Sequence, residues 1–173
     1  IPSKGEIISF SESSATPFVN SIWGAFTNRE SSQSALCAAV VGKVPEYGLL
    51  LKENRKATAK VDIQVKMDKD FDYTLLGWAL PSKIGHRIPV LTGLPSYISP
   101  EALTQLGAEL NTAGSTPMYH IAGMTPEAPD LDTALQNTAP EVEIVITRED
   151  LNEELEKISL AGRPIDFVMF GCP

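Results

Sequence analysis

The residues best suited to chemistry lie in short polar clusters, and the first of these, Ser11-Glu12-Ser13-Ser14, directly follows a strand predicted over Ile7 to Phe10. A carboxylate, hydroxyls and backbone N–H groups at the carboxyl end of a strand could hold a polar ligand. The alternative is a solvated turn in which Glu12, Ser13 and Ser14 only cap the next helix. The spacing alone leaves both interpretations open.

The second cluster is Thr27-Asn28-Arg29-Glu30, which precedes a serine-rich helix start. Arg29 carries a planar fork of donors that suits a carboxylate or a phosphate, and the positive end of the neighbouring helix would add to its attraction for anions. The alternative is a surface pair between Arg29 and Glu30, with the serines acting as N-caps. An anionic ligand therefore remains one of two interpretations here.

The third cluster joins His120, at the end of a short apolar segment, to Glu127, across a loop rich in glycine and proline. A histidine and a carboxylate that bracket a stiff loop could act as acid and base, or orient a metal-bound group. A lone histidine on a strand is more often a hydrogen-bonded core residue. His86 lies in a turn, where we expect it to be exposed and structural.

The two cysteines have different surroundings in the sequence. Cys172 follows an apolar run within Gly-Cys-Pro, a loop context that suits an iron–sulfur or thiolate role, although an inert thiol is the alternative. Cys37 lies in an Ala-rich segment and is predicted to pack in the core. The two could form one disulfide, but the sequence shows neither a secretory signal nor a cysteine-dense framework, so we expect free thiols in a reducing compartment, by default the cytoplasm.

The elements that must position these clusters follow from a hydrophobic period that alternates between about 2 and about 3.6 residues. We expect an α/β fold with a mainly parallel sheet flanked by helices, in which ligands bind beyond the carboxyl ends of the strands. The predicted strands are Ile7 to Phe10, a strand that ends a turn over Lys43 to Leu51, Val61 to Met67, Met118 to Ile121, Val142 to Ile146 and Phe167 to Phe170. The predicted helices are Phe18 to Phe26, Ser34 to Val41, one from Ser99-Pro100 to before Gly114, and one capped by Thr147 and Asp150.

Two of these strands, Val142 to Ile146 and Phe167 to Phe170, are apolar enough to predict burial on both faces.

The stretch from Gly123 to Pro129 is the one candidate hinge. We therefore treat residues 1–173 as a single α/β domain or as a fragment of a longer polypeptide. The start at Ile1 without methionine and the stop at Gly171-Cys172-Pro173 favour the fragment.

The composition excludes several classes of function. The chain has 14 Lys and Arg against 22 Asp and Glu, a net charge of −8, so its average surface repels a polyanion, and we expect no nucleic-acid partner. The apolar runs are far shorter than the roughly 20 residues of a membrane span, and we expect no membrane association. The glycine-rich phosphate loops and the paired-histidine metal motifs of common enzyme classes do not occur.

The same clusters, taken in order, resemble the aconitase X family. The resemblance covers nearly the whole chain, and each short string is weak by itself, but their shared order makes coincidence improbable. The strings are Glu12-Ser13-Ser14-Ala15, Asn20-Ser21, Gly24-Ala25, Thr27-Asn28-Arg29-Glu30, Ser34-Ala35-Leu36, Tyr47-Gly48-Leu49, Glu53-Asn54-Arg55, His120-Ile121-Ala122-Gly123, Thr125-Pro126-Glu127-Ala128 and Gly171-Cys172-Pro173.

The resemblance implies an aconitase-like three-layer αβα fold and a hydro-lyase that dehydrates a small anionic hydroxy acid, such as 5-phosphomevalonate or cis-3-hydroxy-L-proline. Members of the family depend on an iron–sulfur cluster held by three cysteines, and its open iron acts as a Lewis acid on the leaving hydroxyl. Cys172 matches the cysteine of the Gly-Cys-Pro motif, so the resemblance makes it a metal ligand, with the other two ligands outside this chain. The base is a serine of a swivelling domain or small subunit, so this fragment should be inactive alone.

The resemblance also implies roles in binding substrate. Arg29 with Asn28 would clamp a substrate carboxylate, and Glu12, Ser13 and Ser14 would line the pocket. His120 with Glu127 would support the cluster side. The alternative function is a non-catalytic α/β domain that binds a small anion or another subunit, in which case these clusters should scatter over the surface.

Overall fold

The fold is built on a four-stranded sheet in which every strand is parallel to its neighbours. The computed structural model describes residues 1–159, 162 and 164–169. The strands are β1 (Ala59–Ile63), β2 (Pro89–Thr92), β3 (His120–Ile121) and β4 (Val142–Ile146), in the spatial order β3-β2-β1-β4. In the register, Ala59 pairs with both Pro89 and Val142. The expected α/β class with a parallel sheet is confirmed.

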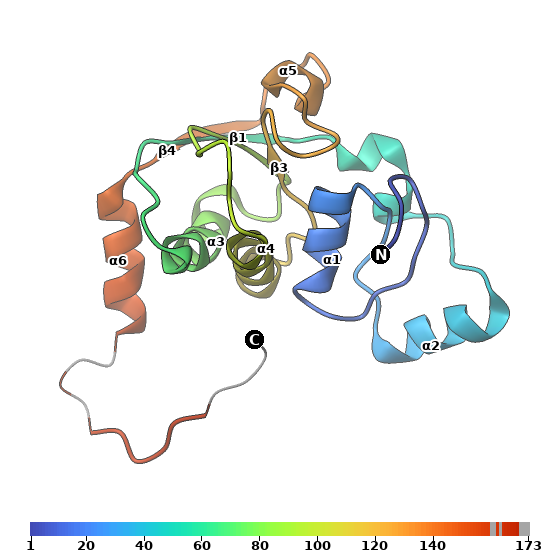
Figure 1. The fold of residues 1–173 in the computed structure, drawn as a ribbon, viewed down its shortest axis with the longest axis horizontal. Helices are drawn as coiled ribbons and strands as arrows, with labels where there is room; N and C mark the ends of the chain where they lie inside the picture. The colour runs from blue at the N-terminus through green and yellow to red at the C-terminus, as the bar shows by residue number, and fades with distance from the viewer. Residues whose placement is uncertain (160–161, 163, 170–173) are drawn as a thin grey trace.

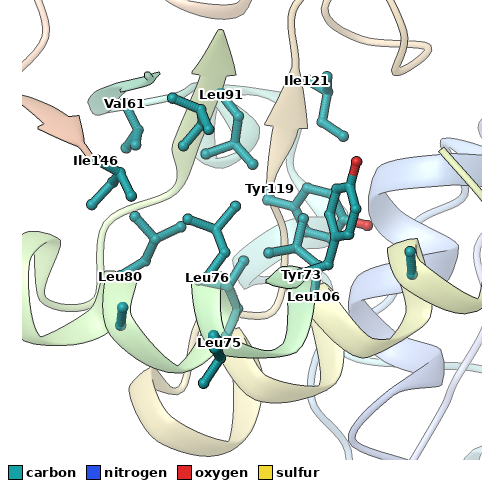
Figure 2. Packing of buried hydrophobic residues seen from close by; sticks show 14 of the residues in the cluster. Val61, Tyr73, Leu75, Leu76, Leu80, Leu91, Leu106, Tyr119, Ile121 and Ile146 are labelled. Atoms are coloured by element: carbon teal, nitrogen blue, oxygen red, sulfur yellow. The ribbon is translucent and has the colours of Figure 1, made fainter. Parts of the chain in front are cut away.

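Two long helices, α3 (Asp70–Ile84) and α4 (Pro100–Gly114), pack side by side against one face of this sheet, and α6 (Arg148–Ile158) lies beside them (Figure 1). Alternate residues of β1, such as Val61, point into this layer. They meet the leucines of both helices in the main core, where Leu76 and Leu106 are fully buried (Figure 2). Burial of this apolar area supplies the main driving force for the fold.

Helix α4 packs against its neighbours through three close contacts at glycine residues. A Cβ at Gly77 of α3 would lie 2.5 Å from the Leu106 carbonyl oxygen, and a Cβ at Gly114 would lie 2.5 Å from Pro81. Gly107 is nearly as tight, because a Cβ there would lie 3.0 Å from Pro17. The backbone of α4 therefore touches its neighbours directly.

The opposite face of the sheet is covered over β2 by the short helix α5 (Leu131–Ala134). Val90 of β2 packs there against Ala134 and Leu135 in a second, smaller core. Over β1 and β4 this face is open, and Val145 of β4 is 46% exposed. The prediction that β4 is buried on both faces is therefore wrong, because the described residues place no helix above it.

The N-terminal region has less regular structure. Ile7 and Phe10 form isolated parallel bridges to Phe26 and Arg29 instead of the predicted continuous strand. The predicted helix over Phe18 to Phe26 is a short α1 (Ala15–Phe18) continued by a π-helix, η1 (Val19–Trp23). It ends at Gly24, whose φ of 64° lies in the left-handed region that favours glycine.

The next segments of this region expose most of their surface. Helix α2 (Ser32–Val41) buries none of its residues, so the prediction that Cys37 packs in the core is wrong. The strand predicted to end near Leu51 is also wrong, because two 3₁₀ helices, η2 (Gly48–Leu50) and η3 (Lys52–Arg55), occupy this stretch.

Other predicted elements agree closely with the structure. Ser99 is the N-cap of α4, and its hydroxyl accepts a hydrogen bond from the Ala102 N–H at 3.1 Å. Thr147 and Asp150 form the predicted capping box of α6. The stretch from Gly123 to Pro129 forms a turn in which the Gly123 N–H donates to the Ala128 carbonyl at 2.9 Å, and its role as a hinge stays a prediction.

Three further segments differ from the prediction or add to it. The sequence pattern gave no sign of α3 or β2. The strand predicted over Phe167 to Phe170 is wrong for Phe167 to Met169, which pair with no strand among the described residues and are 59–81% exposed. Phe170 and Cys172 lie outside the described residues.

Candidate functional site

A polar cleft lies between the N-terminal region and the last turn of α4. Its volume is about 340 Å³. Three segments form it: the turn after Phe10, the residues after the Arg29 bridge, and the end of α4. The lining residues are Ser11, Glu12, Ser13, Thr16, Arg29, Glu30, Asn111, Thr112 and Ser115.

The parallel bridge between Phe10 and Arg29 brings the first two of these segments together. The Glu30 N–H donates to the Phe10 carbonyl at 3.1 Å. Ser11 and Glu30, which follow the two bridged residues, therefore lie at the same end of the bridge. The third segment is attached by the Asn111 side chain, whose Nδ2 donates to the Ser13 carbonyl at 2.9 Å. Backbone pairing and one buried amide thus set the width of the cleft.

The Glu12 carboxylate is turned toward its own backbone. Its two oxygens accept from the N–H groups of Ser14 and Ala15 and from the hydroxyls of Ser13 and Ser14, at 2.5–3.2 Å. Partial burial alone would raise the pKa of Glu12, but these hydrogen bonds outweigh it and lower the pKa. Glu12 is therefore an anion whose acceptor positions, about four for a carboxylate, are filled.

Arg29 has the opposite character. Its side chain is exposed, lines the cleft, and makes no hydrogen bond or ion pair with any of the described residues. The bridge to Phe10 fixes its backbone. A guanidinium without a protein acceptor, held at the rim of a polar cleft, is available to an anionic ligand.

Asn28, by contrast, has its side chain fully occupied. Its Oδ1 accepts from the Leu49 N–H at 2.8 Å, and its Nδ2 donates to the Tyr47 carbonyl at 3.0 Å. Gly48 between them has a φ of 57°, and a Cβ there would lie 2.3 Å from the Asn28 Oδ1. Asn28 therefore holds the loop at Gly48 and does not line the cleft.

His120 and Glu127 form a second cluster, and the structure does not bring it to the cleft. The Nε2 atom of His120 lies 2.8 Å from the Arg55 carbonyl oxygen, which can only accept, so Nε2 carries the proton. Nδ1 is then an acceptor, buried and without a partner among the described residues. Burial lowers the pKa of His120, although the carbonyl and Glu127 favour the charged form, and the ring is neutral near pH 7.

Arg55 is the centre of this second cluster, and sequence reasoning assigned it no role. Its Nε and Nη2 donate to the Glu127 carboxylate at 2.5–3.0 Å, and its guanidinium lies 4.0 Å from the centre of the Phe26 ring. It also donates to the Asn20 Oδ1 and to the carbonyls of Asn20, Ala25 and Leu49. The side chain is buried, so this single cation ties the N-terminal region to the loop after β3.

No signal in the composition or spacing identifies Arg55 as special. It lies in Glu53-Asn54-Arg55, beside charged residues typical of a solvated turn. The only indication was that this string is among those that resemble the aconitase X family. Burial of a guanidinium depends on long-range packing, which the local pattern does not encode.

The described residues do not fit a metal cluster. No group of three or more His, Cys, Asp or Glu side chains within them could hold a metal ion, and Cys37 lies exposed on α2. Cys172, the expected ligand, lies outside them. Within the described part of the chain, no helix is long and apolar enough to cross a membrane.

Two models of known protein families match this chain. The model of the aconitase X second domain matches residues 57–156, and the model of the aconitase X first domain matches residues 1–53. The chain belongs to the aconitase X family. The two matched regions meet at Arg55, and the cleft lies between them.

The relatives are dehydratases of two kinds. The large subunit of phosphomevalonate dehydratase from Thermococcus kodakarensis is 40% identical over 173 residues, which cover 100% of this chain and 43% of the relative. Cis-3-hydroxy-L-proline dehydratase from Pseudomonas aeruginosa is 35% identical over 175 residues, which cover 98% of this chain and 30% of the relative. The chain thus spans less than half of either.

A solved structure agrees with this assignment. The crystal structure of Thermococcus kodakaraensis aconitase X in its holo-form superimposes with a TM-score of 0.82 at 41% identity. The match covers 90% of this chain and 39% of that chain. The resemblance expected from the sequence is confirmed.

Proposed function

We propose that this chain supplies the substrate cleft of a hydro-lyase that removes water from a small anionic hydroxy acid, such as 5-phosphomevalonate or cis-3-hydroxy-L-proline. The observation that carries the proposal is the guanidinium of Arg29, which pairs with no described residue and lies at the cleft between the two aconitase X domains. Both kinds of relative are named for substrates with a hydroxyl group and a carboxylate.

The cleft residues divide into a ligand-binding part and a supporting part. Arg29 binds the substrate carboxylate through two parallel N–H donors, the strongest geometry that an arginine offers. Glu12 and Ser13 line the same first-domain wall as Arg29, whereas Ser14 lies outside the cleft and holds Glu12 by hydrogen bonds. Asn28 does not contact the substrate in this proposal; its side chain holds the loop from Tyr47 to Leu49.

His120 and Glu127 act at the joint between the domains. Glu127 neutralises the buried Arg55, and His120 fixes the Arg55 carbonyl with its Nε2 proton. Together they keep the first-domain wall of the cleft at a constant distance from the second domain. In this proposal they support the site without touching the substrate.

The cofactor and the partner belong to the complete protein. An iron–sulfur cluster with Cys172 as one ligand, and its other ligands outside this chain, is the cofactor that the family suggests. The role of the described residues in binding substrate does not depend on it. The relatives named as large subunits imply a small subunit, and in our proposal this subunit or an equivalent swivel domain supplies the base.

Steady-state dehydration by the complete protein with its partner tests the proposal. Arg29→Gln should lower kcat/KM for the hydroxy acid roughly 100-fold, because a hydrogen-bonded charge pair with the carboxylate is lost. Arg87→Gln is the matched control, since Arg87 pairs with Glu141 away from the cleft, and it should change kcat/KM less than two-fold.

The alternative, a non-catalytic anion-binding domain, predicts a different pair of results. A wild-type protein that binds a hydroxy acid in calorimetry, loses this binding in Arg29→Gln, and dehydrates neither substrate would favour that alternative. Equal activity of Arg29→Gln and wild type would remove Arg29 from the site.

A further inference from the structure

The last turn of α4 forms the second-domain wall of the cleft, and the proposed function gives it no task. Asn111 points inward and holds the Ser13 carbonyl, and its side chain is buried. Thr112 and Ser115 are exposed and line the cleft. Neither hydroxyl makes a hydrogen bond within the described part of the chain.

The backbone holds the Ser115 hydroxyl in an unusual position. Ser115 is the C-cap of α4, with a φ of 56°, and its N–H donates to the Asn111 carbonyl at 3.0 Å. Glycine is the residue that this left-handed position favours. A serine here gives up conformational stability and places a hydroxyl at the cleft.

The charges of the two walls are unequal. On the first-domain wall, Arg29 is a cation that pairs with no described residue, the oxygens of Glu12 are already filled by internal donors, and Glu30 adds a second carboxylate. On the α4 wall, Thr112 and Ser115 offer neutral donors. A ligand that spans the cleft therefore meets a cation and two carboxylates on one wall and two hydroxyls on the other.

We infer that Thr112 and Ser115 determine substrate specificity by binding the polar group at the end of the hydroxy acid remote from the carboxylate that Arg29 holds. The inference rests on the proposed function. Two neutral hydroxyl donors suit a phosphate group, whose oxygens accept several hydrogen bonds at once. A ring amine would instead need an acceptor, and the free acceptors of the cleft belong to other side chains than Thr112 and Ser115. They are the Glu30 carboxylate and the buried Oδ1 of Asn111, which has no partner among the described residues.

The test uses the complete protein with its partner and cofactor, in the double variant Thr112→Val/Ser115→Gly. The Ser115→Gly change removes the hydroxyl and also relieves the left-handed backbone, so loss of stability cannot explain loss of binding. Thr104→Val is the matched control, since Thr104 lies at the start of the second turn of α4, away from the cleft, and its hydroxyl donates to the Pro100 carbonyl at 2.8 Å.

Calorimetry with 5-phosphomevalonate and with mevalonate gives the decisive comparison. The double variant should weaken binding of the phosphorylated acid roughly 100-fold or more, since two hydrogen bonds to a charged group are lost. It should leave mevalonate within two-fold, and in kinetics the loss should appear in KM while kcat stays within two-fold. Thr104→Val should match the wild type throughout.

Several outcomes would overturn the inference. These are unchanged binding of the phosphorylated acid, equal losses for both acids, or a wild-type protein that binds cis-3-hydroxy-L-proline but not 5-phosphomevalonate. If the wild type dehydrates no hydroxy acid while the variant still loses phosphate-dependent binding, the proposed function fails and the α4 wall assignment stands.

Discussion

Replacement of Arg55 by methionine should separate the two halves of the chain, because Arg55 bonds to both. Its guanidinium donates to Asn20, Ala25 and Leu49 on the N-terminal side and to Glu127 on the other. Methionine keeps much of the apolar stem and removes every one of these donors. Any loss of stability therefore reports the polar contacts.

The size of the loss follows from burial of the two partners. Breaking a buried ion pair costs about 3–5 kcal/mol, and the 25% exposure of the Glu127 side chain places this pair toward the lower end. The carbonyl oxygens left without a donor cost about 1 kcal/mol or more each. With the ion pair at about 3 kcal/mol and three such carbonyl oxygens, those of Asn20, Ala25 and Leu49, we expect a total of about 6 kcal/mol, which is comparable to the roughly 5–15 kcal/mol that stabilises a typical domain.

Denaturant unfolding followed by tryptophan fluorescence measures this loss in each half separately. Trp23 lies in η1 and Trp78 lies on α3, so the single-tryptophan variants Trp78→Phe and Trp23→Phe report the first and second domains in turn. In the wild type both should unfold at one midpoint. With Arg55→Met, the Trp23 signal should change at lower denaturant than the Trp78 signal.

Two comparisons make this prediction refutable. Arg87→Met removes an exposed pair with Glu141 and should cost at most about 1 kcal/mol. Glu127→Gln keeps the acceptor oxygen and should cost about 1–2 kcal/mol, which remains measurable if Arg55→Met does not fold. Coincident midpoints for both tryptophans in Arg55→Met, with a loss no larger than that of Arg87→Met, would refute the reasoning.

The remaining predictions concern three other sites. Because folding lowers the pKa of His120, the unfolded state binds the proton more readily than the folded state does. The free energy of unfolding should therefore fall as the pH drops below about 6.5, the ordinary pKa of histidine. His120→Gln should make the free energy of unfolding less dependent on pH between about pH 7 and 5. Gly48→Ala should cost at least about 1 kcal/mol more than Gly42→Ala in denaturant unfolding, because both have a positive φ but only Gly48 lies against Asn28. Cys172→Ser in the complete protein should abolish the visible absorption of a reconstituted iron–sulfur cluster, and an unchanged spectrum would remove Cys172 from the ligand set.

The sequence predicts those elements whose local signals and tertiary packing agree. Helix α4 has Ser99 as N-cap, Pro100 at its first position and leucines on one stripe, and the structure keeps all three. The first turn of α6 is predicted by the capping box of Thr147 and Asp150. In both, the side chain that caps the helix is encoded within a few residues of its start.

The sequence fails where tertiary contacts override the local pattern. Helix α3 continues through Pro81, a residue that normally ends a helix, because the apolar face of α3 is buried against the sheet and α4. Residues 48–55 form 3₁₀ turns instead of a strand, because Asn28 and Arg55 bond to their backbone.

In the candidate site, too, some residues were predicted from the local sequence and others depend on tertiary contacts. The local clusters led to Glu12, Ser13 and Arg29, and the fold places these three in one cleft. It places Asn28 behind that cleft and His120 with Glu127 around a buried arginine. The α4 wall could not be predicted, since Thr112 and Ser115 reach the cleft only through the packing of two domains.

The glycine contacts of α4 limit how this protein could acquire a new substrate. With Gly77, Gly107 and Gly114 each pressed against a neighbour, the helix cannot slide along its axis, and the wall that it presents has a preset position. A larger residue at Gly107 would shift that wall without approaching any ligand. In the proposed hydro-lyase, substrate selectivity would therefore change by exchange of side chains on the last turn of α4, because the glycine contacts set the position of the helix itself.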